Sequence, residues 1–109
     1  TSLDNKSLKE IGYDKNMKKI ITNQAKLAAK AKLDAIVCSP HEIKIVKKFF
    51  KKEIITPGIR FDGDLKGDQR RVATPKQAFK DGATAIVIGR SLVKGNIKKN
   101  IQKLVKDLK

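Results

Sequence analysis

Three arginines and a glutamine lie close together in the polar stretch IITPGIRFDGDLKGDQRR, residues 54–71. Arg60, Arg70 and Arg71 carry planar forks of N–H donors that match the oxygens of a phosphate group. Gln69 adds a neutral amide donor among them. These residue types predict a site that binds an anion, with phosphate as the ligand that suits them.

The glycines and the proline of the same stretch predict a loop that follows a strand. An apolar run ends at Pro57 and Gly58, because proline lacks a backbone donor and glycine tolerates positive φ. Gly63 and Gly67 then let backbone amides approach a ligand closely. The stretch is interpreted as an anion-binding lid at the carboxyl end of a strand, where α/β folds place their ligands. The alternative is a solvated surface loop of a lysine-rich protein.

Helices and strands alternate along the rest of the chain. Apolar residues at helical spacing predict helices, whereas short apolar runs rich in β-branched residues predict strands buried on both faces. The expected helices cover residues 8–11, 16–32, 39–50, 74–82 and 96–108, and the expected strands cover residues 33–38, 53–56 and 83–88.

Several helix boundaries have explicit sequence signals. Asn16 is a plausible N-cap, and Gly82 is expected to end a helix. Capping boxes pair a hydroxyl residue with Glu or Gln three positions later, and three such pairs occur: Ser7 with Glu10, Ser39 with Glu42, and Thr74 with Gln77.

This alternation implies a parallel sheet with right-handed crossovers. Three strands and a stub at Thr1 are too few to close a barrel, since a (β/α)8 barrel needs eight strands and about 250 residues. The fold class is therefore predicted as α/β, the second half of a (β/α)8 TIM barrel from the end of strand 5 through strand 8 and the final helix. Residues 1–109 would form a single partial domain.

Composition narrows the class of protein. The chain has 109 residues, 39% of them hydrophobic, and shows no secretory, transit or membrane-spanning pattern, so a cytoplasmic location is expected. Its net charge is +15, but the lysines are spread at helical spacing without interleaved aromatic residues or a nucleic-acid-binding motif. Neither a nucleic acid nor a membrane is therefore expected as a partner.

Six segments together resemble the bacterial orotidine 5'-phosphate decarboxylases. They are residues 1–3 (TSL), 33–39 (LDAIVCS), 56–60 (TPGIR), 67–71 (GDQRR), 74–75 (TP) and 87–90 (VIGR). The resemblance covers essentially the whole chain and implies an enzyme without cofactor or metal that converts orotidine 5'-phosphate to UMP and CO2. It also implies a homodimer with active sites near the subunit interface.

The resemblance assigns substrate-binding roles to five residues. Thr1 matches a threonine at the end of the fifth strand that contacts the pyrimidine, and Gln69 matches a lid glutamine that binds the phosphate. Gly89 and Arg90 match the pair that holds the same phosphate by a backbone amide and a guanidinium. Arg60 matches another substrate-binding position at the foot of the lid.

Four other residues with reactive or charged side chains are interpreted as surface or structural residues and not as part of the site. His41 follows the start of a helix, and Cys38 lies in an apolar run without a base placed to activate it. Arg70 and Arg71 are adjacent on a loop, where two neighbours rarely face one ligand.

The family's catalytic segment, Asp-x-Lys-x-x-Asp, does not occur in these 109 residues. It is expected upstream, so this chain alone is predicted to be inactive. Two alternatives stay open: another phosphate-binding barrel enzyme that acts on a different sugar phosphate, and a basic nucleotide- or RNA-binding module.

Overall fold

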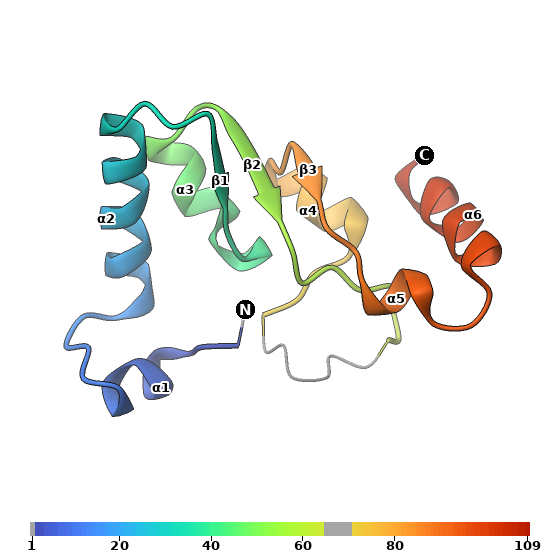
Figure 1. The fold of residues 1–109 in the computed structure, drawn as a ribbon, viewed down its shortest axis with the longest axis horizontal. Helices are drawn as coiled ribbons and strands as arrows, with labels where there is room; N and C mark the ends of the chain where they lie inside the picture. The colour runs from blue at the N-terminus through green and yellow to red at the C-terminus, as the bar shows by residue number, and fades with distance from the viewer. Residues whose placement is uncertain (1, 65–70) are drawn as a thin grey trace.

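A three-stranded parallel sheet forms the centre of the protein (Figure 1). The computed structural model describes residues 2–64 and 71–109. The strands are β1 (Ala35–Val37), β2 (Glu53–Thr56) and β3 (Ala85–Ile86), and their order in the sheet follows their order in the chain. Both neighbouring pairs are parallel, which confirms the predicted sheet, although β1 and β3 are shorter than their apolar runs.

Helices cover one face of this sheet. Helices α3 (Ile43–Phe49) and α4 (Pro75–Asp81) lie behind the strands in Figure 1, and α2 (Met17–Lys30) packs against α3. Their apolar faces pack with β2 in a single core. The helices also form the crossovers that connect each strand to the next parallel strand. The core consists of Ala25, Ile43, Val46, Phe50, Ile54, Ile59, Ala78 and Ala83.

The opposite face of the sheet is open, so the prediction of strands buried on both faces is wrong. In β1 only the middle residue is partly covered, while Val37 is 68% exposed. Val87, which continues β3, is 52% exposed. Three strands cannot curve far enough to enclose their own inner face. The radius of gyration is accordingly 15.1 Å, whereas a compact domain of this length would have about 13 Å.

Most helix boundaries agree with the sequence signals. Asn16 caps α2 by accepting a hydrogen bond from Lys19 N, and Thr74 caps α4 by accepting one from Gln77 N. Gly82 ends α4 with a φ of +114°, a left-handed conformation that favours glycine.

None of the three predicted capping boxes is complete among the described residues. Thr74 caps α4, but the Gln77 side chain donates to Asp81 Oδ1. Helix α1 (Asn5–Glu10) starts earlier than predicted, because the Asp4 carboxylate, not Ser7, accepts the capping hydrogen bond. Ser39 does cap the next helical segment, which begins as the 3-10 helix η1 (Pro40–Glu42). Its Glu42 carboxylate, however, contacts an arginine far along the chain and not the helix start.

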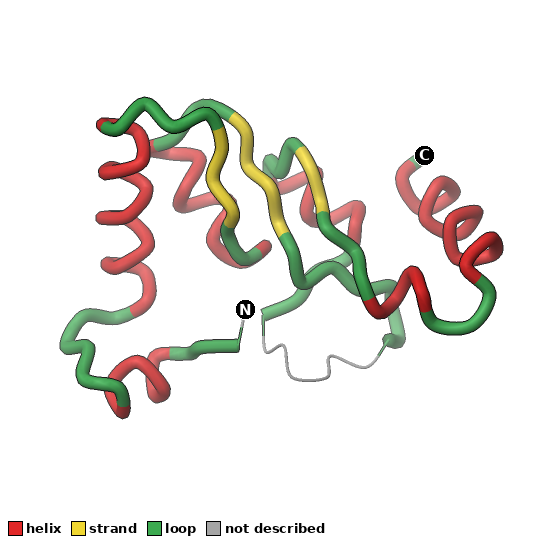
Figure 2. The backbone as a smooth tube through the Cα atoms, in the orientation of Figure 1, coloured by secondary structure: helices red, strands yellow, loops and turns green. Residues whose placement is uncertain are grey.

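The carboxyl-terminal helices lie at one end of the sheet (Figure 2). A short helix that the sequence did not predict, α5 (Arg90–Val93), precedes α6 (Ile97–Leu108). Helix α6 contacts α4 and α5, yet none of its residues is buried. Its apolar residues Ile97, Ile101, Val105 and Leu108 are each about half exposed. None of the helices in the described ranges combines the length and the apolar character that crossing a bilayer demands.

Candidate functional site

The carboxyl ends of the three strands meet at one edge of the sheet, on the side where α5 lies (Figure 1). Thr56, the last residue of β2, is fully buried there. Its hydroxyl donates to the Cys38 carbonyl at 2.7 Å, and its own carbonyl accepts from Val87 N at 2.9 Å. Thr56 therefore joins the ends of all three strands, and the residues that follow each strand emerge along the same edge.

Arg60 emerges at this edge four residues after β2. Gly58 turns the chain with a φ of +77°, and Ile59 then forms a parallel bridge with Ala73. Arg60 N donates to Ala73 O at 3.0 Å. The Arg60 side chain is only 6% exposed, and its Nη1 donates to the Ile59 carbonyl at 3.1 Å. The Arg60 guanidinium is thus held inside the fold.

Gly89 and Arg90 emerge at the same edge from the neighbouring strand. Gly89 is the N-cap residue of α5, and no atom lies within 4 Å of the position that a Cβ would occupy there. Within residues 2–64 and 71–109, no backbone carbonyl accepts a hydrogen bond from Gly89 N. Arg90 follows directly and its side chain is exposed. An amide beside open space and an exposed guanidinium are together suited to hold an anion.

Two of the five predicted substrate-binding residues, Thr1 and Gln69, lie outside the described residues. Residues 65–70 of the predicted lid are also outside them. The structure places Arg60, Gly89 and Arg90 after the carboxyl ends of the neighbouring strands β2 and β3, and the roles of all five remain predictions.

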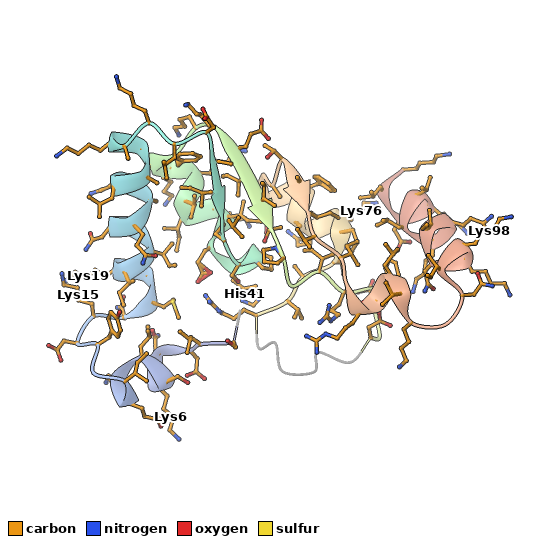
Figure 3. The ribbon with its side chains drawn as sticks, viewed as in Figure 1. Lys6, Lys15, Lys19, His41, Lys76 and Lys98 are labelled. Carbon is orange, nitrogen blue, oxygen red and sulfur yellow. The ribbon has the colours of Figure 1, made fainter. Side chains whose placement is uncertain are left out.

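An ion pair that no sequence pattern predicted lies beside this edge. Arg71 Nη1 lies 2.6 Å from Glu42 Oε1, and both side chains are largely buried. His41 Nε2 lies 3.0 Å from the Val72 carbonyl, and Figure 3 places His41 just beyond the end of β1. A structural role for His41 and Arg71 agrees with these contacts. The partners are 29 and 31 residues apart, so no local pattern reveals them.

Cys38, the only cysteine, lies next to this pair. Burial, reinforced by the negative charge of Glu42 and partly offset by Arg71, raises the pKa of its thiol to about 11. The thiolate is the reactive form, and at this pKa it is scarce at neutral pH. This agrees with the interpretation of Cys38 as an apolar residue and not a nucleophile.

The thiol of Cys38 is expected to resist alkylation in the folded chain. With a pKa near 11, against 9.0 for an unperturbed thiol, iodoacetamide at pH 9 should react about 50-fold more slowly than with the urea-unfolded chain. Mass spectrometry of the intact chain measures both rates. Equal rates would contradict a shielded thiol.

No group of three or more His, Cys, Asp or Glu residues that could hold a metal ion occurs among the described residues.

The lysines are spread around the molecule: in Figure 3, Lys6, Lys15 and Lys19 lie at one end and Lys98 at the other.

Parallel strands with covering helices, and polar residues after the carboxyl ends of the strands, are the arrangement of the α/β class of folds, which includes the (β/α)8 barrels. The chain belongs to the orotidine 5'-phosphate decarboxylase / HUMPS family, whose family model matches residues 1–103.

Two curated relatives are named orotidine 5'-phosphate decarboxylase. The chain is 39% identical to the Coxiella burnetii (strain RSA 331 / Henzerling II) protein over 112 residues, which cover 100% of this chain and 48% of the relative. It is 42% identical to the Moorella thermoacetica protein over 95 residues, which cover 84% of this chain and 38% of the relative. The chain thus spans about half the length of the Coxiella relative.

A solved structure supports the same family and fold. The crystal structure of orotidine 5'-phosphate decarboxylase from Lactobacillus acidophilus superposes on this chain with a TM-score of 0.72 and 29% identity. The superposition covers 99% of this chain and 45% of that one. The predicted fold class, a partial (β/α)8 barrel, is confirmed.

Proposed function

We propose that this chain supplies the phosphate- and base-binding half of an orotidine 5'-phosphate decarboxylase. The whole enzyme would convert orotidine 5'-phosphate to UMP and CO2, the last step of de novo UMP synthesis. The observation that carries the proposal is the position of Arg60, Gly89 and Arg90 at the carboxyl ends of adjacent parallel strands, in a chain of this family.

Each proposed ligand contact follows from the chemistry of its residue. The Gly89 amide would donate to a phosphate oxygen, because the open space beside it admits a ligand against the backbone. The Arg90 guanidinium would form charge-assisted hydrogen bonds to the same phosphate. Gln69 would add a third donor, Arg60 would bind the substrate beside them, and Thr1 would contact the pyrimidine.

The bond-breaking chemistry is proposed to come from elsewhere in the barrel. The 109 residues contain no Asp-x-Lys-x-x-Asp segment. In the proposed mechanism, the lysine of that segment protonates the carbanion-like carbon, while its carboxylates destabilise the carboxylate of the substrate. The phosphate contacts of this chain contribute binding energy remote from the reacting bond, which helps to stabilise the transition state. Neither a cofactor nor a metal takes part in this scheme.

The proposal extends to location and partners. The whole enzyme would be a cytoplasmic homodimer that binds a small-molecule substrate and no nucleic acid. The lysines spread over both ends of the molecule support the last point (Figure 3), because nucleic-acid-binding surfaces concentrate their charge. The relatives, all named orotidine 5'-phosphate decarboxylase, favour neither another sugar-phosphate enzyme nor an RNA-binding module.

A hybrid barrel tests the function. In it, residues 1–109 replace the matched span of the Coxiella burnetii relative, so that the remainder of that protein supplies the rest of the barrel. The hybrid barrel is expected to release CO2 from orotidine 5'-phosphate, whereas the 109-residue chain alone is expected to release none. A folded hybrid without activity would contradict the proposed function. Activity of the chain alone would contradict the proposed division of roles.

A further inference from the structure

A buried ion pair lies beside the candidate site. Arg71 Nη1 and Glu42 Oε1 are 2.6 Å apart, and their side chains are 17% and 8% exposed. A charge removed from water is costly unless it is paired, so neither residue is easily replaced alone. The pair connects η1, which follows β1, to residues 71–73, which precede α4.

A second contact joins the same two segments. His41 Nε2 lies 3.0 Å from the Val72 carbonyl, and these residues stand one position before Glu42 and one position after Arg71. The η1 side is itself fixed, because Pro40 is buried and the Ser39 hydroxyl accepts a hydrogen bond from His41 N. Residues 71 and 72 are therefore held against a rigid part of the fold.

The next residue of this segment holds the backbone of Arg60. Ala73 O accepts from Arg60 N at 3.0 Å, and Ala73 N donates to Gly58 O at 3.4 Å. A continuous path of contacts thus runs from Glu42 through Arg71 and Ala73 to Arg60.

The geometry of the pair favours a positional role over a purely stabilising one. Glu42 Oε2 and Arg71 Nε are buried, and neither has a hydrogen-bond partner in the described part of the chain. A buried pair that leaves polar atoms unsatisfied is often less stable than apolar side chains of similar volume. Unlike apolar residues, the pair fixes the register between η1 and residues 71–73.

We propose that Glu42 and Arg71 form a positioning pair, which fixes the backbone of Arg60 at the edge of the candidate site. The importance of this pair for ligand binding rests on the proposed function. Neither residue needs to contact the substrate, because both act through Ala73 on Arg60.

Backbone amide exchange measured by NMR on the 109-residue chain tests the pair without any ligand. In Arg71→Met, the Arg60 amide is expected to exchange about tenfold faster or more, because its hydrogen bond to Ala73 opens locally. The Thr84 amide, which donates to Ile54 O between β2 and β3, is the reference and should keep its rate.

Matched variants separate position from general stability. Lys52→Met removes the exposed pair with Asp34 at the amino ends of the strands and should leave the Arg60 amide unchanged. Arg71→Lys keeps the positive charge and should recover part of the protection. Glu42→Gln keeps the shape and an acceptor oxygen, so it provides the test if Arg71→Met does not fold. Equal acceleration of Arg60 and Thr84, or no change at Arg60, would overturn the proposal.

A titration with UMP then separates this proposal from the proposed function. If the wild-type chain binds UMP, Arg71→Met should bind it several-fold more weakly, and unchanged affinity would overturn a role in the site. The two proposals can fail separately. If the hybrid barrel neither binds UMP nor releases CO2, the proposed function is contradicted. If slow exchange of the Arg60 amide still depends on Arg71 in that hybrid, the positioning pair is supported.

Discussion

Arg90→Ala in the hybrid barrel is expected to lower kcat/KM for orotidine 5'-phosphate by about 10- to 100-fold. A hydrogen bond to a charged group contributes about 1.5–3 kcal/mol, and each 1.4 kcal/mol corresponds to a factor of about ten. Arg90 is exposed beside Gly89, so alanine should remove the phosphate contact without leaving a buried cavity. Steady-state kinetics measure the loss.

Two controls make this result specific to the phosphate. The same variant should be unchanged towards orotidine, which has no phosphate for Arg90 to bind. Lys94→Ala, which removes an exposed positive charge just after α5, should have little effect on either substrate. Equal losses for Arg90→Ala and Lys94→Ala would mean that general charge attraction, and not a phosphate contact, explains the effect.

Phe50→Ala is expected to lower the free energy of unfolding by about 3–5 kcal/mol, the usual cost of deleting a buried phenylalanine side chain. Phe50 is 2% exposed and lies in the core with Ile43, Val46 and Ile54. Its removal would leave a cavity between α3 and the sheet. Urea unfolding of the hybrid barrel, followed by circular dichroism, gives the free energy.

Phe79→Ala is the matched control, because it deletes the same side chain from α4, where Phe79 is 38% exposed. Its cost should be smaller, since the Phe79 side chain buries less apolar area than Phe50. Equal costs for the two variants would contradict the position of the core.

Sequence patterns predicted helix and strand boundaries correctly where the boundary depends on residues close together in the chain. The caps at Asn16 and Thr74, the end of α4 at Gly82 and the whole of β2 were predicted correctly, because these signals lie within a few positions. They failed at α1, where Asp4 competes with Ser7 for the same role.

Features decided by distant parts of the chain could not be predicted in this way. Glu42 satisfies a local capping pattern, yet its carboxylate pairs with Arg71 because burial makes a charge partner more valuable than a helix cap. Val37 has the sequence of a buried strand residue, but nothing in three strands covers it. Of the candidate site, the sequence placed Arg60, Gly89 and Arg90 at strand ends, but it could not show that Arg60 is held inside the fold.

The match between strand order and chain order bears on how the protein is made. The hydrogen bonds that join neighbouring strands connect residues only 18 and 30 positions apart, as between Thr56 and Cys38 and between Thr84 and Ile54. Each strand therefore pairs with the strand that was synthesised just before it. On the ribosome, β2 can pair with β1 while β3 is still inside the exit tunnel, and the sheet can grow in the direction of translation.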